Sequence, residues 1–318
     1  KVFVCFLLFS ASSNIMIRPA FGCGRLHLRR CLPGNGQTVE VSERTRWRHV
    51  TGEAGRPASS LTNAQRARIL PPAFYRDFYA RTAEEEDRPV RCDDRLARHF
   101  VDCLVKPAEK EALLGSPFRD EEALVAATHA AFVDRVVLDA VGRRFRQLVL
   151  VGSGLDSRAY RLDLPPQFRI LEVDEPEVHD AKAAAMQTSN ARPRCTVSAI
   201  PGSLAEDSEV LHTAFAAARA RAASLVVIDG ELLAGWPGEV RRQAFSSVSA
   251  LAPEGSRLLA QVLRTPHAGE LGATSAMSAA GVIREELAAA GWQRLDVVGH
   301  RALRRLFPGA APSDAAGA

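Results

Sequence analysis

The chain has 318 residues, 47% of them hydrophobic, and a formal net charge of +4. This length and apolar content suit one large α/β core, with or without a helical extension, better than two equal domains. The charge is uneven, because residues 1–70 hold eleven Lys and Arg against three acids and the remainder holds thirty against thirty-four. The remainder therefore has no basic footprint, and we expect no nucleic-acid partner.

Residues 1–70 form a basic leader that we expect to be a targeting or disordered segment. It opens with an apolar run from Val2 to Phe9, too short to span a bilayer but suited to a signal peptide. No acid precedes Glu40, and the scattered Arg and Ser are typical of an organellar transit peptide. The predictions are a removable leader, organellar targeting with the cytoplasm as the alternative, and no stable membrane insertion. Because Lys1 stands where a Met is expected, a truncated reading frame is a further expectation.

Six cysteines are spread along the chain without a C-x-x-C pair or the spacing of metal ligands. Three of them lie in the leader, and the other three have the pattern of ordinary thiols. The sequence therefore predicts neither a disulfide framework nor a zinc or other metal site.

Residues 71–145 are expected to form a helical cap ahead of the sheet. A helical pattern runs from Ser59 to Arg81 and is interrupted by Pro71-Pro72. From Glu121 to Val141 the apolar residues recur close to a 3.6-residue period, which predicts a helix packed on the sheet. This helix leads the chain into the first core strand.

Strands and helices alternate over residues 146–308, which favours crossover units and an α/β fold with a doubly wound, mostly parallel sheet. A tail rich in Ala, Gly and Pro, residues 309–318, is expected to be disordered. The expected strands are 148–152, 169–173, about 195–200, 224–228, 257–263 and 293–298. The expected helices are 156–162, 176–187, 207–221, 238–251 and 281–290.

The first core strand ends in two glycines. Leu148-Val-Leu-Val has no polar residue, so it predicts a strand buried on both faces. Gly152-Ser153-Gly154 then allows a sharp turn and a close approach of a ligand to the backbone. The next strand ends with Glu172 and Asp174, at the place where doubly wound sheets hold the ribose of an adenosine-containing ligand. We therefore predict an adenosine site.

Asp156 bears on which adenosine ligand the loop accepts. A carboxylate in the first helical turn repels a diphosphate, and Ser157 occupies the third small position of a dinucleotide fingerprint. S-adenosylmethionine has no phosphate and carries a sulfonium and an ammonium group, so it tolerates this acid. A helix cap is the structural alternative for Asp156, and both roles are compatible. An NAD(P)-dependent oxidoreductase remains the less favoured alternative.

Two motifs resemble the leucine carboxyl methyltransferase family: Gly152-Ser-Gly-Leu-Asp-Ser-Arg-Ala-Tyr-Arg-Leu162 and Leu171-Glu-Val-Asp-Glu-Pro-Glu-Val178. Weaker matches at Asp93–Phe100, Phe132–Asp134 and Glu286–Trp292 extend the resemblance over residues 88–308. It implies a class I methyltransferase, with a Rossmann-like seven-stranded sheet and a helical N-terminal cap over S-adenosylmethionine. It also implies a small molecule or a protein C-terminal carboxylate as the methyl acceptor.

The resemblance assigns the turn after the fourth strand to the cofactor and substrate side. Asp229-Gly230-Glu231 stands where the family has an acid-glycine-leucine-leucine segment, and it is one residue longer. Trp236 follows where an aromatic residue is expected, as a candidate for the acceptor pocket or, alternatively, for core packing.

Two further positions depart from the family pattern. Ser203-Leu204 stands where an aspartate-leucine pair reaches the adenine amino group, with Glu206 and Asp207 nearby as substitutes. A hydroxyl still accepts that hydrogen bond, but a neutral contact is weaker than a charged one.

His129 stands where the family has an arginine for the methionine carboxylate. Histidine is mostly neutral at pH 7, so Arg135 and Arg158 are alternatives for the missing charge. These departures raise the alternative of a catalytically weakened, methyltransferase-like protein that binds an adenosyl ligand or a partner.

No Ser/His/Asp order, catalytic cysteine pair or metal cluster is visible, so the sequence nominates no general base. A carboxylate acceptor needs no proton removed, whereas an amine or an ordinary hydroxyl needs a base. The expected reaction is therefore methyl transfer to the oxygen of a carboxylate or an acidic hydroxyl.

Overall fold

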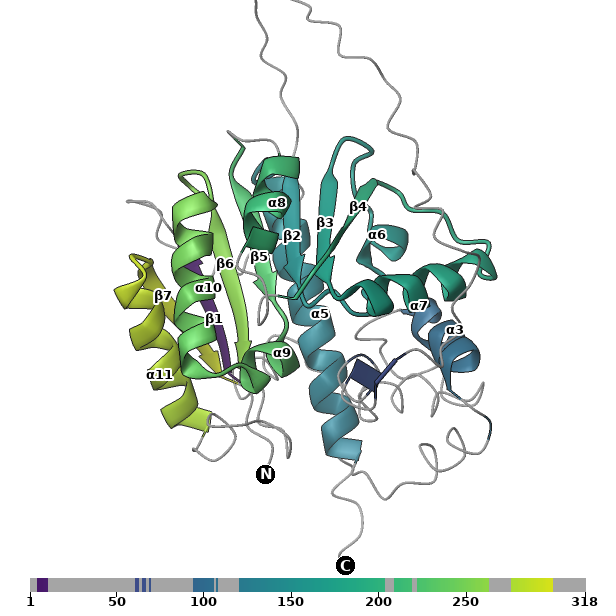
Figure 1. Ribbon diagram of the computed structural model, residues 1–318, viewed down its shortest axis with the longest axis horizontal. Helices are drawn as coiled ribbons and strands as arrows, with labels where there is room; N and C mark the ends of the chain where they lie inside the picture. The colour runs from purple at the N-terminus through teal and green to yellow at the C-terminus, as the bar shows by residue number, and fades with distance from the viewer. Residues whose placement is uncertain are drawn as a thin grey trace, which may run out of the picture.

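In the computed structural model, the described part of the chain comprises residues 5–10, 94–105, 120–203, 209–218, 222–262 and 276–299, with 61–62, 65–66, 69 and 107. A central sheet lies between helices, as Figure 1 shows. The architecture is mixed α/β, which confirms the class expected from the alternating pattern.

Five parallel strands form most of the sheet. β2 lies between β3 and β5 and is parallel to both. The chain continues from β2 outward through β3 to β4 and then crosses to the other side of β2 to form β5, so the direction of winding reverses beside β2. The carboxyl ends of β2 and β5 therefore mark the switch point at which open α/β sheets bind ligands. The five strands are β2 (Gln147–Val151), β3 (Arg169–Asp174), β4 (Thr196–Pro201), β5 (Ser224–Ile228) and β6 (Arg257–Val262).

Two more strands extend the sheet beyond β6, and both pairings of the first of them are antiparallel. β1 (Cys5–Ser10) pairs with β6 and with β7 (Gln293–Gly299), which gives the order β4-β3-β2-β5-β6-β1-β7. Cys5–Ser10 lies within the segment expected to be a leader, and in the structure it pairs with β6 and β7. A short apolar run suits a sheet strand as well as a signal peptide, so its composition could not separate the two.

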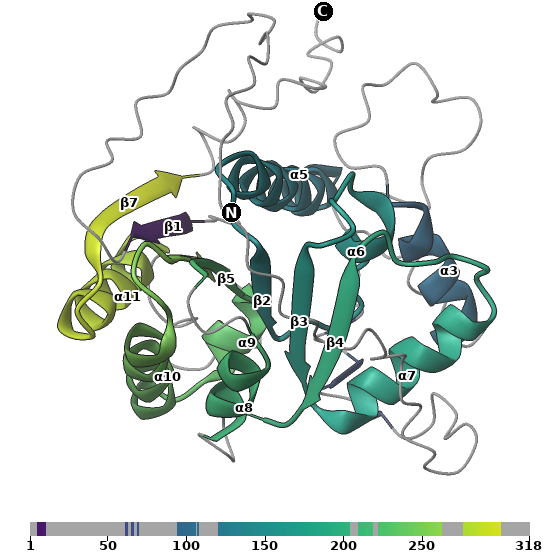
Figure 2. The same cartoon turned by 90° about the horizontal axis from the view of Figure 1, so that it is seen from above.

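Helices cover both faces of the sheet, and strand side chains alternate between the two faces. Val149 belongs to the core under one layer of helices, and its neighbour Leu148 belongs to the core under the other. Figure 2 shows α5 along one face and α8, α10 and α11 along the other. These helices are α5 (Asp120–Gly142), α8 (Glu209–Ala217), α10 (Gly238–Leu251) and α11 (Ala276–Ala289).

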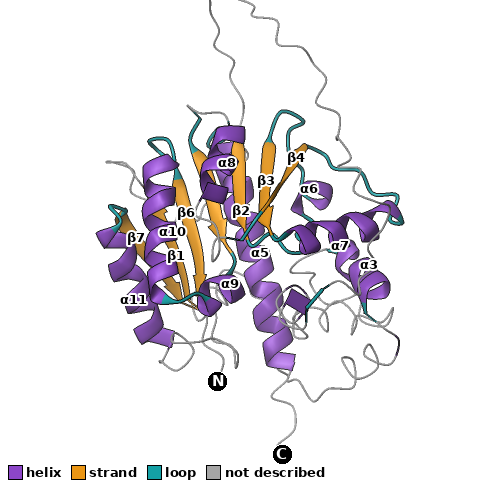
Figure 3. Ribbon diagram, viewed as in Figure 1, coloured by secondary structure: helices purple, strands orange, loops and turns teal. Residues whose placement is uncertain are grey.

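Four further helices have described bounds, and Figure 3 colours them with the others. A third apolar core lies between α3 and α7, whose bounds are given below. It includes Leu61 and Ile69, which are 6% and 4% exposed. Both residues lie within the expected leader, residues 1–70, close to its predicted end. The helices are α3 (Arg95–Leu104), α6 (Arg158–Arg161), α7 (Pro176–Gln187) and α9 (Gly230–Gly235).

The strands expected between residues 148 and 298 are all found, with ends displaced by no more than one residue. The helices expected at 176–187 and 238–251 are found with those bounds, while α11 begins five residues earlier than expected and α9 was not expected. Among the residues described, no helix combines the length and the apolar character needed to cross a membrane.

Candidate functional site

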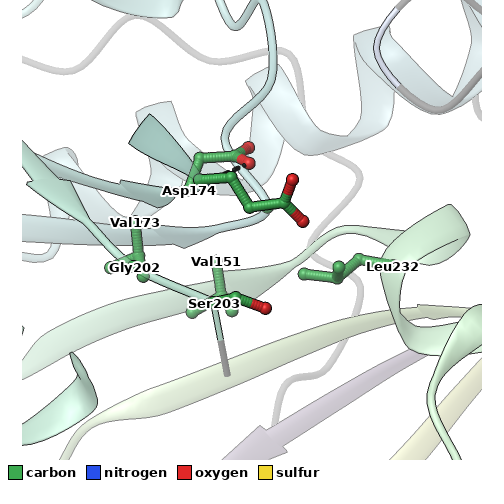
Figure 4. A pocket seen from close by; sticks show the side chains of 8 residues that line it. Val151, Val173, Asp174, Gly202, Ser203 and Leu232 are labelled. Atoms are coloured by element: carbon green, nitrogen blue, oxygen red, sulfur yellow. Dashed lines mark hydrogen bonds between the residues drawn. The ribbon is translucent and has the colours of Figure 1, made fainter. Parts of the chain in front are cut away.

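A shallow, solvent-open hollow lies at the carboxyl ends of the parallel strands. It lies between the turns that follow β2, β3 and β4 and the first turn of α9. In Figure 4 the side chains of Ser203 and Leu232 point toward each other across it, and Asp174 lies to one side. The hollow therefore lies at the switch point of the sheet. It is lined by Val151, Gly152, Val173, Asp174, Glu175, Gly202, Ser203 and Leu232.

Gly152 lies on the floor of the hollow and has no room for a side chain. Its φ of +75° is in the left-handed region, and a Cβ there would lie 2.8 Å from the Leu232 Cδ2 and 2.9 Å from the Asp229 Cβ. Gly154, with φ +49°, has more space, because the nearest atom to a Cβ would be the Ile69 Cγ2 at 3.6 Å. The first glycine is thus required by packing against α9 and the second mainly by its backbone conformation.

The amides of the loop are already engaged within the protein. The N–H groups of Gly152 and Ser153 donate to the Val173 carbonyl at 2.9 and 3.2 Å. The N–H of Gly154 donates to the Asp174 carboxylate at 2.7 Å, and the other oxygen of that carboxylate accepts the Glu175 N–H at 2.8 Å. The loop therefore offers little backbone capacity to a phosphate group.

Glu172 does not reach the hollow. It is 3% exposed and is paired with the Lys182 ammonium of α7 at 2.7 Å. Burial raises the pKa of Glu172, and the neighbouring Lys182 opposes that shift. The Glu172 carboxylate thus pairs with α7 inside the protein, while Asp174, two residues nearer the carboxyl end of the same strand, lines the hollow.

Asp156 is bound by its own helix. Its carboxylate accepts the Arg158 N–H at 2.9 Å, as in an Asx turn just before α6, and forms an ion pair with the Arg158 guanidinium. Arg158 also donates to Asp134 of α5 at 2.8 Å. With two carboxylates on its guanidinium, Arg158 is a poor replacement for the arginine that the family uses.

Asp134 joins α5 to α6. Burial acts to raise its pKa, but the guanidinium groups of Arg158 and Arg161 outweigh burial and leave the pKa below its ordinary value. Arg161 donates to Asp134 at 2.5 and 2.7 Å and also approaches Asp94 at 3.5 Å. These ion pairs, here called the Asp134 clamp, hold the segment that follows the glycine loop against α5.

Asp94 extends this clamp to α3. It caps that helix by accepting the Ala97 N–H at 3.2 Å and accepts a hydrogen bond from the Ser157 hydroxyl. Burial raises the pKa of Asp94, although Arg161 opposes the shift. No feature of the sequence alone indicated that these residues meet.

The turn after β5 forms the side of the hollow opposite Asp174. Asp229 accepts the Leu232 N–H at 3.0 Å, and Gly230 begins α9. Glu231 lies in α9, but its side chain is outside the described part. Trp236 is 5% exposed within the apolar core beneath α8 and α10, so core packing describes its place better than the acceptor pocket does.

The residues that depart from the family pattern differ in whether they line the hollow. Ser203 lines the hollow, as expected, while Leu204, Glu206 and Asp207 lie outside the described residues. His129 is buried in α5 at 5% exposure and does not line the hollow. Arg135 is exposed on the same helix.

A segment before α3 covers the loop from outside, which sequence reasoning missed. Thr62 and Gln65 cap each other reciprocally, at 2.8 and 3.1 Å, as in a helix-starting capping box. Gln65 then donates to the Glu175 carboxylate at the rim of the hollow. The spacing of threonine and glutamine was a readable signal, but nothing in it indicated Glu175 as the partner.

The electrostatic character of the hollow is acidic. Two of its lining residues are carboxylates, and no Lys, Arg or His is among the residues that line it. No group of three or more potential metal ligands occurs among the described residues. Such a surface suits a ligand with hydroxyl groups and positive charge.

Comparison with known proteins fits this geometry. Residues 76–228, which include the glycine loop, Asp174 and β5, match the leucine carboxyl methyltransferase family. The match spans a little under half of the chain. The resemblance drawn from the motifs is thereby confirmed.

Proteins similar to this chain occur in mycobacteria. A "Putative S-adenosyl-L-methionine-dependent methyltransferase" of Mycobacterium ulcerans is 33% identical over 199 residues, which is 58% of this chain and 62% of the relative. A similarly named protein of Mycolicibacterium smegmatis is 36% identical over 132 residues, 42% of this chain and 43% of the relative. The chain thus spans about three fifths of the length of the first of these relatives.

A family 2 O-methyltransferase from Planctomyces limnophilus, solved with apigenin, is 18% identical with a TM-score of 0.28. That match covers 58% of this chain and 67% of the other, and the score is below the level that indicates a shared fold. The mycobacterial relatives are bacterial proteins, and they lend no support to an organellar address.

Proposed function

We propose that this protein is an S-adenosylmethionine-dependent methyltransferase. The observation that carries the proposal is the internal engagement of the loop: the amides of Gly152, Ser153 and Gly154 all bond to β3 or to Asp174. A dinucleotide would bring a pyrophosphate to amides that are already occupied and to a hollow lined by acids. S-adenosylmethionine brings a ribose, an adenine and two cationic groups instead. The names of the mycobacterial relatives support the same choice.

The architecture that goes with this proposal is the class I methyltransferase fold, a seven-stranded sheet with a helical N-terminal cap. In the described residues α3 and the short segment around Gln65 are the parts that would belong to such a cap. They contact α7 and the rim of the hollow, respectively, and so would exclude water from a bound ligand.

The residues that would hold the cofactor are those gathered at the hollow. Asp174 would accept from the ribose hydroxyls, since a carboxylate with two oxygens can take further hydrogen bonds besides its two amides. Ser203 would face the adenine amino group. Bound S-adenosylmethionine supplies an electrophilic methyl group, and the protein's part is to hold the acceptor oxygen in line with it.

We propose a carboxylate or an acidic hydroxyl as the acceptor, either on a small molecule or at a protein C-terminus. The described residues that line the hollow include no histidine or lysine that could act as a base, and a carboxylate acceptor needs none. The family match supports the same acceptor class.

A second function, binding of an adenosyl ligand without turnover, is favoured by one observation. The Arg158 guanidinium is occupied by Asp134 and Asp156, so it is not free to bind the methionine carboxylate. Weak retention of that carboxylate would lower the rate of transfer more than it lowers adenosine affinity.

Calorimetry on the full chain with S-adenosylmethionine, S-adenosylhomocysteine, NAD and NADP tests the proposal. We expect the first two to bind and the nicotinamide cofactors not to bind; NAD binding alone would reject it. A methyl-transfer assay against a pool of carboxylate metabolites then separates turnover from binding alone.

A further inference from the structure

The motif Glu286–Trp292 lies far from the hollow in the sequence, yet hydrogen bonds connect the two. Glu286 of α11 is 9% exposed and accepts from the Arg241 guanidinium of α10, at 3.1 Å from Nε and 3.0 Å from Nη2. Arg241 is 2% exposed, and its Nη1 donates to the Trp236 carbonyl at 2.7 Å. All three guanidinium nitrogens are therefore engaged, one of them at the end of α9.

The contact with Trp236 continues through α9 to the hollow. The Trp236 N–H donates to the Leu232 carbonyl at 3.2 Å, and the Leu232 N–H donates to Asp229 at 3.0 Å. The Asp229 N–H donates to the Val151 carbonyl at 2.9 Å. Leu232 and Val151 both line the hollow, so the relay ends at its wall.

α9 needs an external anchor for physical reasons. It has six residues, and a helix this short is not stable by itself in water. Its last carbonyls have no partners further along the helix, and Pro237, which follows Trp236, has no N–H to contribute. The Arg241 guanidinium supplies the missing donor at this end.

We propose that Arg241, oriented by Glu286, is a positioning residue that fixes α9 and thereby the Leu232 wall of the cofactor hollow. This inference rests on the proposed function only in naming S-adenosylmethionine as the ligand of the hollow. An ion pair with no role beyond stability is the competing explanation, and the two differ in what happens when both charges are removed together.

Two variants of the full chain separate these explanations. Arg241→Met removes the donor to Trp236 and leaves the buried Glu286 carboxylate with only the exposed Arg242 guanidinium, 3.7 Å away, as a counter-ion. Both stability and ligand affinity should therefore fall. The double variant Arg241→Met/Glu286→Gln removes both charges, so its Tm should recover toward that of the wild type. Its Trp236 carbonyl still has no donor, so affinity for S-adenosylhomocysteine should remain about tenfold weaker than in the wild type.

Val248→Ala is the matched control. Val248 lies on α10 with Arg241 and is fully buried in the apolar core of that face, so its truncation lowers Tm without removing any hydrogen bond to the end of α9. We expect the wild-type affinity for S-adenosylhomocysteine in this variant. Affinity that follows Tm across all three variants, recovering in the double variant, would overturn the proposal.

Amide hydrogen exchange gives a readout that does not depend on any ligand. Exchange of the amides from Leu232 to Trp236 should accelerate at least about tenfold in both Arg241 variants and stay unchanged in Val248→Ala. Unchanged exchange there would reject the positioning role even if the wild type binds the cofactor. Faster exchange in a protein that binds no adenosyl ligand would keep the positioning role and reject the proposed function.

Discussion

The Asp174 carboxylate at the end of β3 and the Gly154 amide in the loop after β2 are joined by a 2.7 Å hydrogen bond. The same carboxylate accepts the amide of Glu175 at 2.8 Å. An acid that lies beside the hollow thus also sets the shape of the loop that forms it. Changes at Asp174 should therefore affect loop conformation and ligand affinity together.

We predict that Asp174→Asn weakens S-adenosylhomocysteine binding by about tenfold or more, because an amide nitrogen would face one of the two N–H donors and a charge-assisted bond is worth about 1.5–3 kcal/mol. Calorimetry with the full chain measures the affinity. The control is Asp163→Asn, an exposed carboxylate that does not line the hollow. Equal affinities for the wild type and Asp174→Asn would place the ribose elsewhere.

The two loop glycines should respond differently to substitution. Gly152→Ala should lower Tm and abolish binding, because its Cβ would lie under 3.0 Å from atoms of Leu232 and Asp229. Gly154→Ala should cost only about 1–2 kcal/mol, since its Cβ has space and the penalty is that of the left-handed backbone. Thermal unfolding of both variants gives the order, and a larger loss at Gly154 would contradict it.

Gly154→Val is expected to impair binding more than Gly154→Ala does. A β-branched side chain is poorly tolerated at φ +49°, and its methyl groups would extend toward Ile69, which already lies 3.6 Å from the Cβ position. Calorimetry on both variants tests this. An unchanged affinity in Gly154→Val would remove the loop from the ligand site.

The parallel strands could be predicted because each is a short apolar run closed by a polar or glycine turn. Leu148–Val151 and Leu225–Ile228 are buried on both faces, so every position in these runs is apolar. The family resemblance gave Ser203, and the strand ends gave Gly152 and Asp174, as lining residues of one hollow. Local pattern was sufficient for these because the ends of parallel strands meet at one edge.

The sequence could not show which of two nearby acids reaches the ligand site, or which charged side chains bind each other. Glu172 and Asp174 both follow the pattern of a ribose acid, and only the position of Lys182 on α7 shows that Glu172 is turned inward. Arg158 and Asp156 were considered separately for the ligand, but they bind each other. Cys5–Ser10 pairs with strands more than two hundred residues away, and such long-range pairing leaves no local signature.

The clamp around Asp134 predicts a specific dependence of stability on pH. The folded pKa of Asp134 lies below its ordinary value of 3.8, so its ion pairs stabilise the fold in full above that value and are lost as the pH falls through the folded pKa. Asp134→Asn should lower the free energy of unfolding by about 2–3 kcal/mol at pH 7. The difference from the wild type should shrink below about pH 4.

Urea unfolding at pH 7 and pH 3 measures that difference. The control is Asp102→Asn, whose carboxylate is 43% exposed and 4.0 Å from Arg98, so its loss should change little at either pH. A difference between Asp134→Asn and the wild type that stays constant with pH would mean that packing, not charge, accounts for the effect.

The last prediction concerns Ser203, which lines the hollow where the family has an aspartate. If Ser203 faces the adenine amino group, Ser203→Asp should restore a charge-assisted acceptor and tighten S-adenosylhomocysteine binding by about 1 kcal/mol. Ser203→Asn is the matched control, because it offers an acceptor of similar reach without the charge and should bind like the wild type. Since Asp174 and Glu175 already line the hollow, a new carboxylate that found no donor would only add repulsion and weaken binding. Tighter binding in calorimetry would therefore place the adenine at this turn, whereas weaker or unchanged binding would assign the adenine amino group to another residue.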